Sequence, residues 1–187
     1  MHSGRPPADG EGVTSGEQLC LACGLCCDGT LFNHVKLGPR DDVSKLKALG
    51  MPVAISRAQT PVTHFRQPCA ALCADRICRV YADRPLQCRS FECGVFKAAA
   101  AGRIEFPVAL RLVKSARRQA DHLRRLLRAL GDTEEHRALS ERFRRTQRRM
   151  ESGSADPAAA DTFAELSLAM HSLNLLAHEE FYTKTDP

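Results

Sequence analysis

The chain has 187 residues, enough for one domain or for one domain with an extension. Hydrophobic residues make up 43% of it, which suits an ordinary soluble core, while aromatic residues make up only 5% and the net charge is +5. No apolar run approaches the roughly 20 residues that a membrane-spanning helix needs, so we expect no membrane partner.

The first residues carry no apolar segment of the kind that opens a secretory signal. Residues 1–16 contain several glycines, prolines and charged side chains. We therefore expect a disordered N-terminal lead over residues 1–16 and a cytoplasmic location.

Nine cysteines, all before residue 94, dominate the composition. A disulfide framework needs an oxidising compartment and usually an even number of cysteines, whereas this number is odd and no export signal is visible. Clustered thiols in a reducing cytosol are more often metal ligands or redox groups. The distribution predicts a cysteine-cluster metal-binding module over residues 17–101 and a helical extension over residues 102–187.

Regular structure in the module is expected to be short and separated by loops, because metal bonds can replace a large core. Pro39 suits the start of a helix that Gly50 would stop, and Arg84-Pro85 breaks any helix in the second cysteine block. The expected elements are a strand over residues 31–37, a helix over residues 41–49 and a candidate strand over residues 52–55.

The extension begins with a long amphipathic pattern that ends near Gly131. Apolar residues recur at steps of three and four, which predicts one face of a helix made by Ala109, Leu112, Ala116, Ala120, Leu123, Leu127 and Leu130. Basic residues occupy the other side, at Arg111, Lys114, Arg118, Arg125 and Arg128.

Two further helices are expected after Gly131. Asp132 or Thr133 can cap the first of them, and its apolar line is thin, with Leu139, Phe143 and Met150. A linker at residues 151–154 separates it from a third helix, for which Asp156-Pro157 forms an N-cap and first-turn signal. This third helix would bury Phe163, Leu166, Met170, Leu173 and Ala177. The fold expected overall is an α-rich α+β protein with two or three helices in the extension.

The first cysteine block reads Cys20-Leu21-Ala22-Cys23-Gly24-Leu25-Cys26-Cys27. Spacings of two residues let sulfurs converge on one ion, and Gly24 tolerates the positive φ that such a turn often needs. The first three cysteines are similar to the start of a ferredoxin run, but the fourth is adjacent instead of three residues on. Since neighbouring side chains point apart in extended backbone, Cys26 and Cys27 either serve different centres or divide into a ligand and a supporting residue.

The second block contains Cys69, Cys73, Cys78, Cys88 and Cys93, with arginines beside the thiols at positions 79, 84 and 89. Four thiolates on Zn²⁺, or on a 4Fe–4S cluster in its 2+ state, leave a net charge of −2. Guanidinium groups nearby can offset that charge and donate hydrogen bonds to sulfur, although a solvated arginine face explains the same pattern.

The two blocks together resemble the CxxCxxCC cysteine-cluster family of zinc- or iron-chelating proteins, also called YkgJ-like. The resemblance covers residues 20–93 and rests on both blocks in order, with a Tyr-x-x-Arg-Pro element between the cysteines of the second. It implies metal chelation by eight cysteines: Cys20, Cys23, Cys26, Cys27, Cys69, Cys78, Cys88 and Cys93. Cys73 is outside this set. A similar module occurs in flagellin lysine N-methylases, so the resemblance also allows an enzyme or enzyme accessory linked to protein lysine methylation.

Eight cysteines can fill two four-thiolate sites, and soft thiolates suit zinc, Cu(I) and iron–sulfur clusters alike. A closed four-cysteine zinc site would be structural, whereas a cluster would add redox activity. The ferredoxin-like start favours an iron–sulfur cluster, such as a 4Fe–4S cluster, in at least one site, and zinc or iron is the expected metal. His34 and His64 are further candidate ligands, although such histidines are more often surface residues.

Charge in the extension is uneven and suggests a third function, a zinc-stabilised binding module. Residues 102–151 carry 14 basic and 7 acidic side chains, while residues 152–187 carry 1 and 6. The basic helices could meet an acidic protein partner or nucleic acid. Nucleic acid is the less favoured partner, because Phe143 is the one aromatic residue available for base stacking in the basic helices at residues 108–150.

Overall fold

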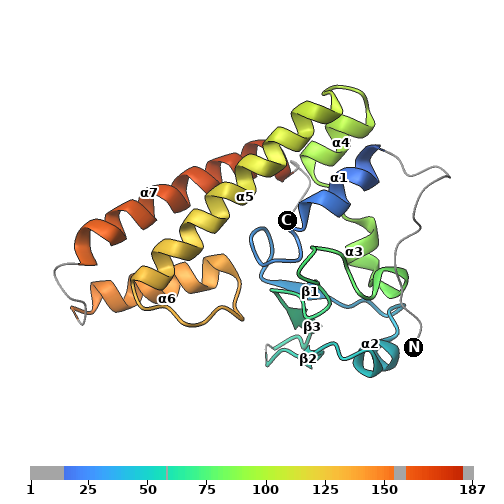
Figure 1. Ribbon diagram of the computed structural model, residues 1–187. Helices are drawn as coiled ribbons and strands as arrows, with labels where there is room; N and C mark the ends of the chain where they lie inside the picture. Colours follow the sequence, from blue (N-terminus) through green and yellow to red (C-terminus); the bar gives the residue numbers. More distant parts are fainter. Residues whose placement is uncertain (1–14, 58, 154–158, 183–187) are drawn as a thin grey trace.

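The computed structural model describes residues 15–57, 59–153 and 159–182, and the protein is an α-rich α+β fold (Figure 1). Of the disordered lead expected at residues 1–16, residues 1–14 lie outside the described residues, as does the capping signal at Asp156-Pro157. Ser15 and Gly16, expected in the lead, instead begin a helix. The elements in chain order are α1 (Ser15–Cys23), β1 (His34–Lys36), α2 (Val43–Ala48), β2 (Ala54–Ile55), β3 (Thr63–Arg66), η1 (Tyr81–Asp83), α3 (Leu86–Ser90), α4 (Gly94–Ala100), α5 (Phe106–Ala129), α6 (Leu139–Glu151), α7 (Ala160–Leu176) and the π-helical turn η3 (Ala177–Phe181).

A small antiparallel sheet in the order β1-β3-β2 organises the first half of the chain. Val35 pairs with Phe65, and both side chains are buried, while the neighbours of Val35 in β1 are exposed. The alternation that predicts a strand near residues 31–37 therefore places one face of the sheet on a core. That core also contains Leu37, Leu46, Met51, Ala71 and Val80.

Helix α2 confirms the helix expected around residues 41–49, with a later start. Its N-cap is Asp42, whose carboxylate accepts a hydrogen bond from the Lys45 N–H at 2.8 Å. Gly50 follows the helix at φ +81°, a conformation that few other residues adopt without strain.

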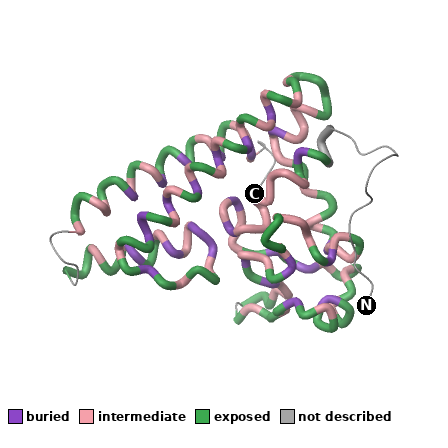
Figure 2. Tube along the Cα trace, in the orientation of Figure 1, coloured by how far each residue is buried: buried purple, intermediate pink, exposed green. Residues whose placement is uncertain are grey.

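Helices α5, α6 and α7 pack together as a long arm beside the cysteine-bearing part, with α5 and α7 running alongside each other (Figure 1). Buried and exposed positions alternate along both helices (Figure 2). The small side chains of Ala109, Ala116 and Ala120 are at most 1% exposed and let the helices approach closely. The predicted stripe is confirmed at Leu123 and Leu127, and the basic residues expected on the other side are exposed.

One hydrophobic core joins the cysteine-bearing part to the helices. Leu19 and Leu25 of the first cysteine block are buried in the same cluster as Val113 of α5 and Phe181 of η3. The chain around Gly29 also touches the start of α6, where the Leu139 N–H donates to the Gly29 carbonyl at 2.9 Å. The extension therefore packs on the cysteine-bearing part as well as on itself.

Two features differ from the sequence expectations. Asp132 caps no helix: α6 starts at Leu139, and the Asp132 carboxylate is buried against the Arg142 guanidinium at 2.6 Å. The first cysteine block is helical over α1, and the segment after Cys93 forms α4, so the cysteine-bearing part contains more helix than expected. Packing of Leu19 and Val95 on the shared core explains both helices, because a short segment gains most of its helical stability from tertiary contacts.

Candidate metal centre

The first cysteine block runs from a helix into a tight turn. Cys20 and Cys23 lie on the last turns of α1, and Gly24 ends the helix at φ +70°. The Gly24 carbonyl then accepts hydrogen bonds from the Cys27 and Asp28 N–H groups, at 3.0 and 2.9 Å. This turn presents Cys26 and Cys27 after the helix, as the glycine at this position predicts.

Backbone contacts bring the second block onto the first. The Cys69 N–H donates to the Cys27 carbonyl at 2.7 Å, which fixes the segment after β3 against the turn. Cys88 lies on α3, and Cys93 is the N-cap of α4, where its Sγ accepts from the Phe96 N–H at 3.4 Å. Residues separated by more than 40 positions in the sequence therefore meet in one place.

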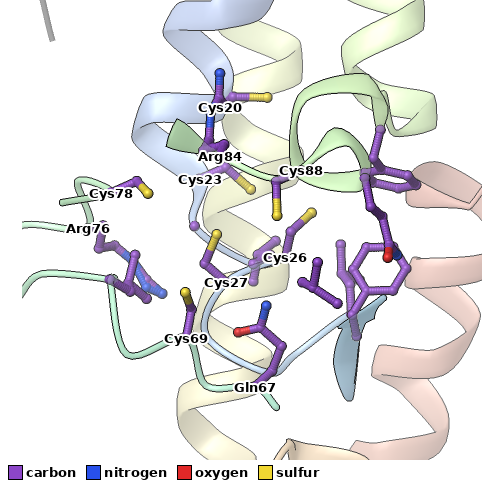
Figure 3. A pocket seen from close by; sticks show the side chains of 18 of the residues that line it. Cys20, Cys23, Cys26, Cys27, Gln67, Cys69, Arg76, Cys78, Arg84 and Cys88 are labelled. Atoms are coloured by element: carbon purple, nitrogen blue, oxygen red, sulfur yellow. The ribbon is translucent and has the colours of Figure 1, made fainter. Parts of the chain in front are cut away.

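All eight cysteines that the family resemblance implies as ligands line a single cavity of about 140 Å³ (Figure 3). Cys73 is exposed and is not part of the cavity wall. The nine cysteines, which all lie in the described ranges, form no disulfide. The cavity thus separates the eight from the ninth as the family pattern does, while their role as ligands stays a prediction.

Charge interactions between the cysteines fall mainly within two groups of four, which meet at the adjacent pair Cys26 and Cys27. Beyond burial, the pKa of Cys23 is raised by Cys93 and Cys20, and the pKa of Cys26 by Cys23, by its neighbour Cys27, and by Cys93 and Cys20. Beyond burial, the pKa of Cys27 is raised by Cys69, Cys88 and Cys78, and the pKa of Cys88 by Cys69 and Cys78. Cys78 is influenced by Cys73, which lies outside the eight, and Cys78 also raises the pKa of Cys69. We call Cys20, Cys23, Cys26 and Cys93 the first group, and Cys27, Cys69, Cys78 and Cys88 the second group.

The donor set fits a soft metal, since each group offers four sulfurs. Within the described ranges, no three His, Cys, Asp or Glu side chains already stand in an arrangement that could hold an ion. Binding would therefore draw the sulfurs of a group closer together.

Burial favours the protonated form of six of the cavity thiols, because it raises their pKa. It raises the pKa of Cys23 and of Cys88 to about 12, with neighbouring cysteines adding to the effect at both positions. Burial likewise raises the pKa of Cys26, Cys27, Cys69 and Cys78. A metal ion must displace these protons to bind the thiolates, because the thiolate is the ligand.

Two of the three arginines noted beside the thiols act on the second group. Arg79 favours the thiolate forms of Cys69 and Cys78, and Arg84 favours those of Cys78 and Cys88. The Arg84 guanidinium also lies 3.7 Å from the centre of the Tyr81 ring. Arg89 is exposed at a separate polar pocket, so the solvated interpretation applies to it.

The two candidate histidines lie away from the cavity wall. His34 and His64 sit on paired strands with ring centres 5.6 Å apart, and neither lines the cavity. Burial and the neighbouring His64 lower the pKa of His34.

Sequence reasoning missed the polar residues that accompany the thiols. Gln67 is buried and lines the cavity, as does Arg76, whose guanidinium pairs with Asp28 at 2.6 Å. Arg124 of α5 also reaches Asp28, at 3.2 Å. The one local signal for this network is the position of Asp28, directly after Cys27.

Comparison with known families bears on this cavity. Residues 19–104 match the family model CxxCxxCC, whose description reads "Putative zinc- or iron-chelating domain". No curated protein and no solved structure matches the chain. No helix in the described ranges is long and apolar enough to cross a membrane.

Proposed function

We propose that this protein binds two metal centres through two sets of four cysteines. The match of residues 19–104 to the CxxCxxCC family model, a zinc- or iron-chelating domain, supports metal binding. The first group (Cys20, Cys23, Cys26, Cys93) would hold one centre and the second group (Cys27, Cys69, Cys78, Cys88) the other. The observation that carries the proposal is the single cavity lined by all eight cysteines, in which Cys20, Cys23 and Cys93 act on Cys26 while Cys69, Cys78 and Cys88 act on Cys27. Adjacent cysteines at positions 26 and 27 would then serve different centres.

Charge supports the proposal more strongly for the second group. Four thiolates around a divalent ion leave a net charge of −2, which is costly in a buried site unless cations lie nearby. Arg79 and Arg84 supply positive charge beside the second group, whereas no arginine is among the main influences on Cys23 and Cys26. The two centres are therefore expected to differ in affinity.

The identity of the metal follows from the chemistry of the donors. Zinc closed by four thiolates would serve structure, and an iron–sulfur cluster would supply one-electron transfer when bound. The ferredoxin-like spacing of Cys20, Cys23 and Cys26 supports a cluster in the first group. The arginine-flanked second group suits either zinc or a cluster.

Metal analysis of the full chain, purified anaerobically, tests the proposal. We expect about two four-thiolate centres per chain, as about two zinc ions or as iron and sulfide with absorption near about 400 nm. A protein that folds without metal, and that takes up none when zinc or iron and sulfide are supplied, would contradict it.

A second candidate function uses the exposed basic side chains of α5. Arg111, Lys114 and Arg118 lie in solvent on the side away from the buried stripe. Other basic residues of this region are already paired, such as Arg128 with Glu135 at 2.8 Å. An acidic protein partner is the proposed occupant, ahead of nucleic acid. The link to protein lysine methylation stays a prediction.

A further inference from the structure

Arg76 has a backbone conformation that arginine rarely adopts. Its φ is +68°, and it is the one non-glycine residue with positive φ in the described ranges. The position is at the tip of a turn, where the Arg76 N–H donates to the Cys73 carbonyl at 2.9 Å. A glycine would relieve this strain, so the arginine side chain must offset it through its contacts.

Those contacts run inward, toward the turn of the first cysteine block. A methyl group added at Gly24 would lie 3.4 Å from Arg76 Nε and 3.6 Å from its Cζ. These are ordinary contact distances, so the Arg76 side chain lies directly against the Gly24 position without being crowded. Glycine is favoured there by its φ of +70°, which side chains of L-residues rarely allow.

Two other residues hold the guanidinium in place. Both of its terminal nitrogens donate to Asp28 Oδ2, at 2.6 and 3.4 Å. Arg124 of α5 secures the same aspartate, with its Nη2 3.2 Å from Asp28 Oδ2, 3.2 Å from the Asp28 carbonyl oxygen and 3.0 Å from Thr30 Oγ1. The side chains of Arg76, Asp28 and Arg124 are only 19%, 10% and 18% exposed.

The remaining nitrogen of Arg76, Nε, is buried and has no hydrogen-bond partner among the described residues. Arg76 lines the cavity together with the cysteines, and Figure 3 shows its side chain on the side of Cys69. Sulfurs are the abundant acceptors in that wall, and a thiolate accepts a hydrogen bond better than a protonated thiol does.

The charges around Arg76 also favour a contact with a thiolate. Two guanidinium groups share the single buried carboxylate of Asp28, so one positive charge is not neutralised in the interior. Asp121, which pairs with Arg124 at 2.8 Å, is 56% exposed, and water screens its charge. The excess positive charge lies beside a cavity whose thiols become anionic when metal binds.

We propose that Arg76 is a positioning residue for the metal centre of the second group, donating its Nε–H to one of the sulfurs of Cys27, Cys69, Cys78 or Cys88 once metal is bound. Asp28 and Arg124 hold it in place, so a helix of the extension supports a site in the cysteine-bearing part. This inference rests on the proposed function, and Arg76 is not itself a ligand.

The experiment uses the full chain loaded with Zn²⁺ and titrated with a chromogenic zinc chelator. Arg76→Gly removes the side chain and relieves the positive φ, while Arg76→Lys keeps a cation for Asp28 but has no Nε–H. Both variants are expected to bind one of the two zinc ions about 10–100-fold more weakly and to leave the other unchanged. Arg124→Gln should weaken the same ion, and Arg125→Gln, on the exposed side of α5, should match the wild type.

The outcomes separate this inference from the function beneath it. If the wild type binds two zinc ions and Arg76→Lys binds both with the same affinities as the wild type, the proposed role of Nε is overturned while the proposed function stands. Wild-type protein that binds no zinc and no iron–sulfur cluster would overturn the proposed function and the inference with it. Circular dichroism of each zinc-loaded variant checks that the fold is kept, and Arg76→Lys decides the matter where Arg76→Gly does not fold.

Discussion

Replacing Gly94 with alanine tests how tightly the packing of α4 against η3 holds Cys93 of the first group in place. Gly94 directly follows Cys93 and starts α4. A Cβ added there would lie 2.4 Å from the Glu180 carbonyl oxygen and 3.2 Å from its carbon. Both are backbone atoms next to the fully buried Phe181, so they cannot move aside as the end of a flexible side chain would.

The cost can be worked from this overlap. Inserting a methyl group into a well-packed site lowers the free energy of unfolding by about 1–3 kcal/mol. For a chain of this size, each kcal/mol shifts the melting temperature by about 2–4 °C, so Gly94→Ala should melt roughly 2–12 °C lower. The displacement would also move Cys93, and zinc in the first group should be lost to a chelator more readily.

Thermal denaturation of the metal-loaded full chain measures the effect, with Gly38→Ala as the matched control. A Cβ at Gly38 would meet only Asp41 Oδ2, at an ordinary contact distance of 3.8 Å, so that variant should melt like the wild type. If Gly94→Ala and Gly38→Ala have the same melting temperature, the close packing of α4 against η3 is refuted.

Three further predictions concern protons, a buried ion pair and the basic helices. Because burial raises the pKa of Cys23 and Cys88 to about 12, zinc affinity should rise with pH. Zinc added to weakly buffered protein should release about four protons per ion, one from each thiol that it binds. Zinc binding without acidification of the solution would contradict the protonated state of the thiols. Asp132→Ala leaves the charge of Arg142 buried without its partner and should lower the free energy of unfolding by about 3–5 kcal/mol in urea titrations. The control Glu135→Ala, at an exposed pair, should lower it by less than about 1 kcal/mol, and equal losses would show that the Asp132 pair is not buried in solution. Nucleic acid should bind the metal-loaded protein weakly, with affinity falling about tenfold or more between about 50 and 200 mM salt, and micromolar binding that survives physiological salt would favour nucleic acid over an acidic protein.

The sequence was most informative where structure is local and periodic. Helix α5 and its buried face follow from apolar residues at three- and four-residue steps, and Gly131 stands at φ +79° just beyond the helix end. The third predicted helix is confirmed at Leu166, Met170 and Leu173, which are buried. These features depend on residues within a few turns of one another.

Features set by distant contacts were not predictable in the same way. Strand β3 is only four residues long, and it pairs with β1, which lies about 30 positions earlier, as well as with the nearby β2. Asp132 has the residue type of a helix cap, but its partner Arg142 is ten positions away and buried with it. A capping pattern cannot be distinguished from a buried ion pair without knowing what packs above it.

In the candidate site too, the local features could be predicted from the sequence and the long-range contacts could not. Spacing and family resemblance were enough to nominate the eight cysteines, and the cavity wall contains those eight and not Cys73. Their grouping depends on how the turn after Gly24 directs Cys26 and Cys27, and on which loop returns to each. The Asp28, Arg76 and Arg124 network spans 48 and 96 positions, and no local pattern marks it.

Metal content of paired cysteine variants tests the two-centre account most directly. Cys23→Ser with Cys93→Ser removes two ligands of the first group, whereas Cys23→Ser with Cys88→Ser removes one ligand from each group, and Cys73→Ser is the control. The account predicts that the control keeps the full metal content, the same-group pair keeps about half, and the cross-group pair keeps almost none. Equal metal loss in the two paired variants, or loss of metal from Cys73→Ser, would contradict the division into two four-cysteine centres.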